Sequence, residues 1–476
     1  MKLPFWVNKT TWTAVSPKLL PFADVVSEDL PLSRLLRLSL FQVTVGMAAT
    51  LLIGTLNRVL ILEMGVSAWL VALMVAVPLV FAPFRALVGF KSDQHRSVLG
   101  WRRVPYIWIG TLLQFGGLSI MPFALILLSG DTHWPAWFSL GASTLAFLLV
   151  GAGMQTTQTA GLALATDIAS EESRPRVVAL MYVMLLVGMV ISGIVFSFFL
   201  NPFSQFQLIQ VVQGAASVTI FLNIIALWKQ EARQPHITNP DRDIPDFKES
   251  WKSFAGHAQI KRFLITLGLG TAAFSMQDII LEPYGGEILH LSVSQTSLLT
   301  ALMSGGALFA FALAARWLSK GHDPYRIAGL ALLVGLVAFA AVIFAEPMSS
   351  PTLFRIGATL IGFGAGLFSV STLIIAMQLD NLGMTGMAIG AWGAVNTMSS
   401  GLAISLGGLI RDLISEIAQQ GYLGEALHHP AIGYQFVYHI EIYLIFATLI
   451  ALGPLVLYRS KPNGSVMKFG LADLPG

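Results

Sequence analysis

Twelve apolar runs, each about 20 residues or longer, constrain this chain more than any other feature. Because the backbone polar groups of a lipid-exposed segment must be satisfied within that segment, each run predicts a membrane-spanning helix. Only 11% of the residues are charged, whereas soluble domains are nearer a quarter. The sequence therefore predicts an all-α integral membrane protein with spans at 36–60, 67–88, 104–128, 136–166, 177–200, 207–228, 263–282, 293–317, 326–346, 351–378, 386–410 and 434–458.

A polar gap divides the runs into two sets of six. It contains seven basic residues and no apolar run, which is typical of a solvated linker. The first residues combine Trp6 and Trp12 with lysines, a mixture suited to the membrane surface. The predicted segments are an interfacial N-terminal segment (1–34), a six-helix bundle (35–228), a cytoplasmic linker (229–262), a second six-helix bundle (263–458) and a tail (459–476).

The basic residues indicate the orientation in the membrane. All but four of the 28 Lys and Arg residues lie in the two tails or in loops on the side of the N-terminus. The exceptions are Arg58, Arg85, Arg355 and Arg411. Since loops rich in Lys and Arg stay in the cytoplasm, both termini are expected there.

Two internal similarities relate the two sets of six. Residues 151–167 and 364–380 both begin Gly-Ala-Gly and end in Asp at the same spacing. Aligning Gly46 with Gly270 in the first helix of each set places Arg58 opposite Glu282. Parallel six-helix repeats joined by a cytoplasmic linker are the plan of the major facilitator superfamily, which is therefore the expected fold.

The stretch 274–286, FSMQDIILEPYGG, places polar groups near the end of a membrane span. A carboxylate there costs roughly 2.5–3.5 kcal/mol on insertion scales unless it faces protein or water. Asp278 and Glu282 are four residues apart, so a helix ended by Pro283 would present both on one face. Together with Gln277 and Tyr284, they predict the polar wall of a cavity.

Arg58 follows Asn57 late in the first span. One interpretation is an arginine whose stem lies in the bilayer and whose charge reaches the interface. The other uses the repeat: Arg58 would pair with Glu282 across the two halves and close the cavity on the non-cytoplasmic side.

On the cytoplasmic side, charged residues follow the second and fourth spans. Glycine allows a tight turn, and a carboxylate can bond a helix end or a basic pair. The pattern after the second span is similar to the loop signature of major facilitators, although Gln94 stands where a basic residue is usual. We expect either a gate or a solvated loop, built from Gly89, Asp93, Arg102, Arg103, Asp167, Arg174 and Arg176.

Gln155 and Gln158 lie in the fourth span. They are interpreted either as residues that hydrogen-bond a neighbouring helix or as part of the cavity wall. His290 and His439 lie near the outer boundary and do not form a pair at helical ligand spacing, so no metal site is predicted. They stay the candidate ligands for the metal ion of a bound molecule. With no cysteine, no Gly-Lys and no His-Glu pair, the sequence excludes thiol chemistry, a Walker loop and a zinc-protease helix. We expect neither an enzyme nor a nucleotide cofactor, and no nucleic-acid partner.

Five motifs carry a family resemblance: FSMQDIILEPYGG (274–286), GTLNRVLILEMGV (54–66), TQTAGLALATD (157–167), ESRPRVVALMYVM (172–184) and APFRALVGFKSDQHRSVLGWRR (82–103). With them the chain resembles the bacteriochlorophyll delivery family of the major facilitator superfamily. Its members are light-harvesting assembly factors of the PucC and LhaA types, of which the LhaA type is preferred here. By this resemblance, Arg58 and the Gln277–Glu282 stretch line the central cavity.

The resemblance implies a function. The chain would carry bacteriochlorophyll as cargo and deliver it to antenna polypeptides, the core complex (LH1) being preferred over the peripheral one (LH2). It would lie in the bacterial inner membrane, including its intracytoplasmic photosynthetic part. Its partners there would be bacteriochlorophyll synthase, translocation machinery and the lipid bilayer.

Two other functions stay open at this point. The chain could be a proton-coupled secondary transporter of a small solute, with Asp278 or Glu282 carrying the proton. It could also be a scaffold without cargo that recruits pigment synthase and translocation machinery.

Overall fold

The computed structural model describes residues 32–80, 88, 92, 103–128, 135–169, 174–231, 258–378 and 385–458. These residues form helices and their connections, and no strand occurs among them. The predicted N-terminal segment up to residue 31, most of the linker (232–257) and the tail from 459 lie outside the described residues.

In the described part of the first half, the first span consists of five consecutive helical pieces, and longer helices follow it. The pieces of the first span are α2 (Leu32–Leu38), α3 (Leu40–Ala49), the π-helix η4 (Thr50–Thr55), α4 (Leu56–Arg58) and the π-helix η5 (Val59–Glu63). The helices that follow are α5 (Ala68–Val80), α7 (Val104–Leu128), α8 (Ala136–Ile168), α9 (Arg174–Phe199) and α10 (Gln205–Leu227).

The second half also begins with an interrupted span, made of α12 (Ala258–Ser275), the 3-10 turn η7 (Met276–Ile279) and α13 (Leu281–Glu287). It continues with α14 (Val293–Ser319), α15 (Pro324–Ala345), α16 (Pro351–Gln378), α17 (Thr385–Gln419), the short η9 (Glu425–Leu427) and α18 (Ile432–Tyr458).

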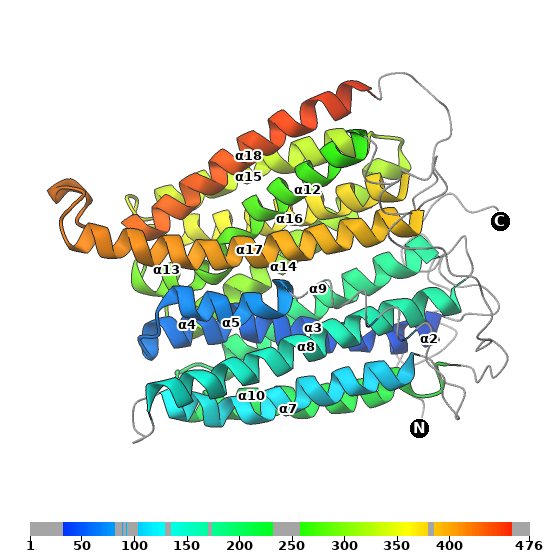
Figure 1. The fold of residues 1–476 in the computed structure, drawn as a ribbon, viewed down its shortest axis with the longest axis horizontal. Coiled ribbons are helices and arrows are strands. Elements are labelled where there is room, and N and C mark those ends of the chain that lie inside the picture. Colours follow the sequence, from blue (N-terminus) through cyan, green and yellow to red (C-terminus); the bar gives the residue numbers. More distant parts are fainter. Residues whose placement is uncertain are drawn as a thin grey trace, which may run out of the picture.

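The all-α membrane fold predicted from the apolar runs is confirmed. Ten helices among the described residues are long and apolar enough to cross a membrane. Helices α5 and α17 occupy the positions of the predicted second and eleventh spans. The described chain begins at α2 and ends at the end of α18 on the same end of the molecule (Figure 1). That end is cytoplasmic by the charge distribution, and we call the opposite end the outer end.

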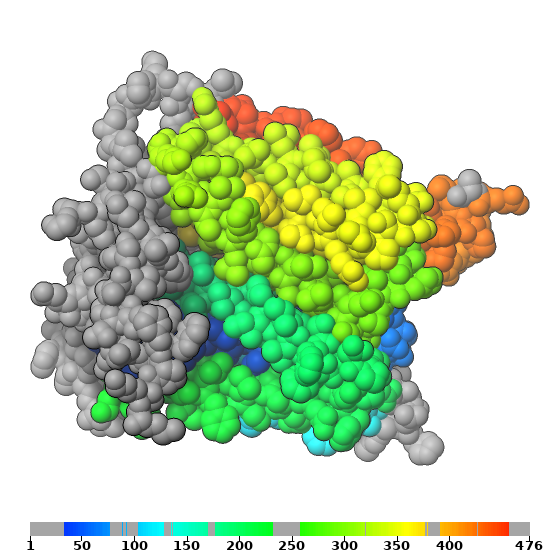
Figure 2. Space-filling view, turned by 180° about the vertical axis from the view of Figure 1, so that it is seen from behind, coloured from blue at the N-terminus to red at the C-terminus, as the bar shows by residue number. Residues whose placement is uncertain are grey.

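Two helix pairs join the halves. Helix α5 packs along α17, and α9 packs along α14. Figure 1 shows the helices of the first half below those of the second, and Figure 2 shows from behind where α9 meets α14. At the α9–α14 crossing a Cβ atom on Gly193 would lie 2.8 Å from the Ala301 side chain, so this contact needs the glycine.

Two helix ends differ from the predicted boundaries. Helix α12 begins at Ala258, inside the range predicted for the linker, and Arg262 in its first turns donates from Nε to the carbonyl oxygen of Ala451 (2.8 Å) on α18. Helix α17 continues nine residues past the predicted end at 410. Its extension begins at Arg411 and Asp412, whose side chains are 14% and 18% exposed and hydrogen-bond each other (2.8 Å). The charged start of the extension is therefore largely enclosed by protein.

We expect Gly362→Ala to destabilise the second half. A Cβ atom on Gly362 of α16 would lie 2.0 Å from the backbone oxygen of Met303 on α14, and such overpacking costs about 1–3 kcal/mol. Thermal unfolding in detergent, followed by tryptophan fluorescence, should show a midpoint several degrees below that of the parent. The control is Gly214→Ala on α10, where an added Cβ meets nothing within 4 Å and the midpoint should stay or rise. Equal midpoints for the two variants would contradict the close α14–α16 packing.

Candidate functional site

The first spans of both halves depart from regular α-helix at matching positions. The repeat alignment relates residue i of the first half to residue i + 224 of the second. It places the π-helices at 50–55 and 59–63 opposite 274–279 and 283–287, where the second half has its 3-10 turn and α13. Interrupted helices at corresponding places in two repeats indicate a functional region in transporter folds. The candidate site is therefore the region where these two interrupted spans meet.

Glu282 of α13 lies against the first span at Gly54. A Cβ atom on Gly54 would be 2.6 Å from Glu282 Oε1, so glycine opens the notch in which the carboxylate lies. Thr300 of α14 donates to the same Oε1 atom (2.7 Å). One turn away, the hydroxyl groups of Thr55 and Ser297 lie 3.1 Å apart. Polar groups buried on both halves thus hold the first span, α13 and α14 together.

The predicted ion pair between Arg58 and Glu282 is wrong. Arg58 Nη1 donates to Oε1 of Glu63 on its own span (2.7 Å), and Nη2 donates to the carbonyl oxygen of Leu291 in the second half (3.2 Å). The reason is geometric. The π-helix brings Glu63, five residues on, within reach of Arg58, while Glu282 is held one turn away at Gly54. Arg58 still crosses between the halves, but it does so through a backbone carbonyl.

The prediction that Asp278 and Glu282 share one helix face ended by Pro283 is also wrong. The α-helix stops at Ser275, before both carboxylates. A proline inside a helix clashes with the carbonyl four residues earlier, so α-helix cannot continue from Ile279 to Pro283. The chain instead breaks at η7, and Pro283 lies in the first turn of α13, where its missing N–H costs nothing.

The break is held by side chains from two other helices. Asn57 Nδ2 donates to the carbonyl oxygen of Asp278 (3.4 Å), and Gln277 Nε2 donates to Asp278 Oδ1 (2.6 Å). The backbone N–H of Gln277 donates to Oε1 of Glu441 on α18 (2.7 Å). Glu441 is fully buried, and it was not predicted as a site residue. The available signal was a lone carboxylate within the twelfth apolar run, which is rare without a structural or functional role.

Tyr284 lies in an aromatic cluster rather than on an open wall. Its ring is fully buried, with centroids 5.5 Å from Phe354, 5.4 Å from Tyr434 and 5.5 Å from Tyr438. Such edge and tilted arrangements are favourable beyond simple burial. The cluster fixes α13 against α16 and α18.

Arg411 joins four helices at the outer end, and the sequence analysis assigned it no role. Its Nη2 donates to Glu287 Oε2 (2.8 Å) and lies 2.7 Å from the Tyr434 hydroxyl, which also donates to Glu287 (2.6 Å). Asp412 accepts from Arg411 Nη1 and from the backbone N–H of Trp69 on α5 (2.7 Å). The signal was present: Arg411 and Glu287 are charges at the ends of apolar runs.

On the cytoplasmic side the structure brings two of the predicted gate residues together. Arg103 Nε donates to Asp167 Oδ2 (3.0 Å), and Nη1 donates to the Ser92 hydroxyl (2.6 Å). Glu231, which the sequence analysis missed, accepts from the backbone N–H groups of Arg103 and Val104 at the start of α7, where a carboxylate is favourable. Gly89, Asp93 and Arg102 lie outside the described residues, as do the side chains of Arg174 and Arg176.

The remaining candidates lie on α8, on α18 and in the turn after α13. Gln155 and Gln158 are half-buried on α8, and Oε1 of Gln155 is buried without a hydrogen-bond partner. His290 and His439 are both exposed, and Nδ1 of His439 lies 2.7 Å from the carbonyl oxygen of Gln435 in its own helix. The two histidines are therefore not part of the buried site.

The arrangement also leaves buried polar atoms without partners where the two interrupted spans meet. They are Asn57 Oδ1, Gln277 Oε1, Glu282 Oε2 and Glu441 Oε2. Such atoms can accept hydrogen bonds from an enclosed water or ligand. The chemistry that these four acceptor groups offer is the binding of a hydrogen-bond donor.

We expect charge exchange to identify the true partner of Arg58. Arg58→Glu alone should lower the thermal midpoint, because the new carboxylate would face Glu63 and the Leu291 carbonyl would lose its donor. The expected loss of unfolding free energy is about 1–3 kcal/mol. Adding Glu63→Arg should recover at least half of the lost midpoint, since the opposite charges are restored. Adding Glu282→Arg should not, because the Gly54 notch has no room for a longer side chain. Rescue by the Glu282 exchange alone would contradict the geometry described above.

Comparison with known proteins places the chain in a family. The family described as "PUCC protein" matches residues 55–460. A relative named as an uncharacterized protein in the puhA-bchM intergenic region of Rhodobacter capsulatus is 53% identical over 96% of this chain and 97% of its own length. Protein PucC of Rhodovulum sulfidophilum is 53% identical over 84% of this chain and 89% of its own length.

Among solved structures, a bacterial homologue of the human lysosomal transporter Spinster, in an inward-facing and occupied conformation, has a TM-score of 0.67 at 15% identity. The match covers 92% of this chain and 100% of that chain. At this identity the likeness shows the fold alone, and it confirms the predicted major facilitator fold. The family match over most of the chain, together with relatives at 53% identity, shows that this multi-pass membrane protein belongs to the PucC family.

Proposed function

We propose that this protein is an assembly factor that binds bacteriochlorophyll and delivers it to light-harvesting antenna polypeptides in the photosynthetic inner membrane. The observation that carries the proposal is the PucC family match, which runs from the first span through both halves to residue 460. What the family resemblance implies for its members is thereby extended to this chain. The core antenna (LH1) is the preferred recipient over the peripheral antenna (LH2).

The contacts at the outer end support a handover within the membrane. The halves are joined there by contacts of Glu282 with Gly54, Thr55 with Ser297, and Arg58 with Leu291. A lipophilic cargo needs no exit into the outer aqueous phase, because its recipient is a membrane helix. Delivery would therefore proceed sideways, to an antenna polypeptide beside the protein. The synthase would supply the pigment, and translocation machinery would supply the nascent antenna chain.

The role proposed is non-enzymatic. Transfer of an intact pigment makes and breaks no covalent bond in the cargo, so it needs binding groups and a conformational path rather than a catalytic pair. The polar atoms where the two halves meet are of this kind.

A proton-coupled secondary transporter is the second candidate, and the buried carboxylates of Glu282 and Glu441 favour it. Oε1 of Glu282 accepts a hydrogen bond from Thr300, and Oε1 of Glu441 accepts one from the backbone N–H of Gln277. The second oxygen of each carboxylate is buried without a hydrogen-bond partner. A carboxyl group in such a position could carry a proton in a transport cycle.

The test is a near-infrared absorption spectrum of the protein, purified gently from a host that makes bacteriochlorophyll. We expect a pigment band in stoichiometric amount, because a delivery factor holds its cargo between synthase and antenna. A colourless protein that still restores antenna assembly in a deletion strain would overturn the delivery role in favour of a scaffold.

Glu282→Gln and Glu441→Gln separate delivery from proton-coupled transport. Glutamine keeps the acceptor oxygen for Thr300 or for the Gln277 N–H, but its amide cannot take up and release a proton as a carboxyl group does. We expect the pigment content and antenna assembly of both variants to stay within about twofold of the parent. Loss of function in both, with unchanged thermal midpoints, would favour the transporter.

A further inference from the structure

An apolar groove runs along the membrane-facing surface where the two halves meet. It has a volume of about 610 Å³ and lies between α9 on one side and α14 and α16 on the other. Gly305 forms part of its floor, where an added Cβ would meet nothing within 4 Å. Phe309 and Phe363 form an aromatic pair at the end of the groove nearer the cytoplasmic side (6.0 Å between ring centroids). Nearly all of its lining is hydrocarbon, so it excludes water and polar groups.

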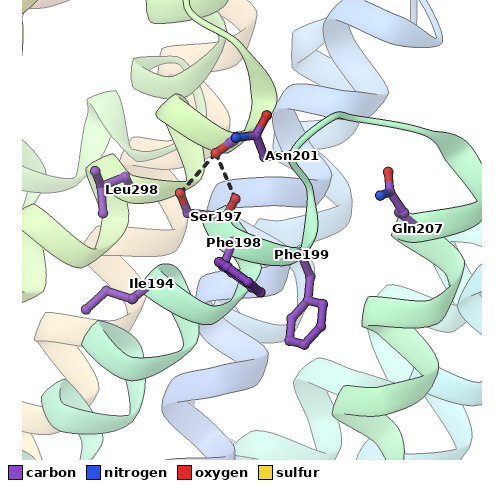
Figure 3. Close-up of a pocket in the computed structure, with 8 residues that line it drawn as sticks. Ile194, Ser197, Phe198, Phe199, Asn201, Gln207 and Leu298 are labelled. Carbon is purple, nitrogen blue, oxygen red and sulfur yellow. Dashed lines mark hydrogen bonds between the residues drawn. The ribbon is translucent and has the colours of Figure 1, made fainter.

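A second hollow of about 550 Å³ adjoins the groove at its outer end. The two hollows share Ile194 and Leu298 in their linings, so they lie next to each other along α9 and α14. Figure 3 shows this outer mouth, with Gln207 of α10 on one side and Ser197 of α9 on the other. The Ser294 hydroxyl donates to the carbonyl oxygen of Ser197 (2.7 Å), which joins the two halves at the mouth. The polar side chains here are hydroxyls and amides: Ser197, Asn201, Gln207 and Ser294.

The dimensions fit one extended hydrocarbon chain. From Ser294 at the mouth to Phe309 at the inner end, α14 spans fifteen residues, or roughly 22 Å at 1.5 Å per residue. The volume lies within the roughly 300–1,000 Å³ typical of small-molecule sites. A transmembrane helix, about 10–12 Å wide, would cover such a groove rather than enter it.

The polar mouth selects among amphiphiles. Among the residues that the structure describes, neither hollow is lined by Lys or Arg, the residues that recognise phosphate and carboxylate groups. The Asn201 and Gln207 side chains offer amide N–H donors suited to neutral ester and ketone oxygens. This composition favours an uncharged ester head over the phosphate head of a phospholipid.

We propose that this groove binds the long isoprenoid ester tail of bacteriochlorophyll, with the ester end of the pigment at the mouth formed by Asn201 and Gln207. The inference rests on the proposed delivery function and names the part of the cargo that this surface recognises. The tail enters from the bilayer between α9 and α14, so cargo is held by the seam between the halves.

The experiment compares two pigments that differ only in the tail: bacteriochlorophyll a and bacteriochlorophyllide a, which lacks the esterifying alcohol. Each is titrated against the full-length protein in nanodiscs of one phospholipid, and binding is read from pigment fluorescence. Gly305→Leu and Gly305→Phe fill the groove stepwise in open space. Gly214→Phe on α10, also in open space and outside both hollows, is the matched control.

We expect the Kd for bacteriochlorophyll to rise at least tenfold with Gly305→Phe, less with Gly305→Leu, and not at all with Gly214→Phe. The Kd for bacteriochlorophyllide should stay within twofold in all variants. If both pigments bind the parent and the Gly305 variants change neither Kd, the groove assignment is overturned while delivery stands. If the Gly305 variants lose co-purified phospholipid but no pigment, the groove is a lipid site and the assignment is likewise overturned.

If the parent binds neither pigment, the delivery function fails, and a photoreactive C20 isoprenoid alcohol then tests the groove separately. Labelling of α14 or α16 that Gly305→Phe abolishes would keep the groove as an isoprenoid site. Labelling that Gly305→Phe leaves unchanged would overturn it.

Discussion

The contact of Glu282 with Gly54 and Thr300 is the interaction on which the outer half of the molecule depends. It needs a glycine in the first span, a carboxylate after the break in the second half, and a hydroxyl on α14. The carboxylate would be strongly unfavourable in an apolar interior without a partner. Its burial between the first span and α14 explains why polar residues occur where the interrupted spans meet.

Interruption of the two first spans makes this contact possible. In the first half, π-helical turns widen the helix around Arg58 and bring Glu63 to its guanidinium. In the second half, Pro283 forces a break that is stabilised from outside by Asn57 and Glu441. The same repeat position has thus been adapted in two ways, by widening one helix and by breaking the other. Arg411 and Tyr284 then fasten the shortened α13 to the surrounding helices.

The sequence was sufficient for the all-α membrane fold, because that fold follows from the length of the apolar runs. The candidates it named for the cavity or gate included Asn57, Arg58, Gln277, Asp278 and Glu282, which meet at the interrupted spans, but also Gln155, Gln158 and Tyr284, which lie elsewhere. It could not identify their partners. The Arg58–Glu282 prediction assumed regular helices, and one π-helical turn is enough to shift a guanidinium from one carboxylate to another. Glu441, Arg411 and Glu231 were missed because their role depends on which helices neighbour them, and that is decided by packing between residues far apart in sequence.

Helix α14 serves two surfaces at once. Ser297 and Thr300 bond the first span and Glu282, whereas Leu298 and Gly305 on the adjoining face line the lateral groove. A rotation or shift of this rod must alter both. The two effects must then be reciprocal. If an occupant of the groove strengthens the contacts between the halves at the outer end, those contacts raise the affinity for the occupant by the same free energy. Loosening the seam, for instance when another membrane helix docks beside α9, would weaken retention of the occupant at the same moment that an acceptor arrives.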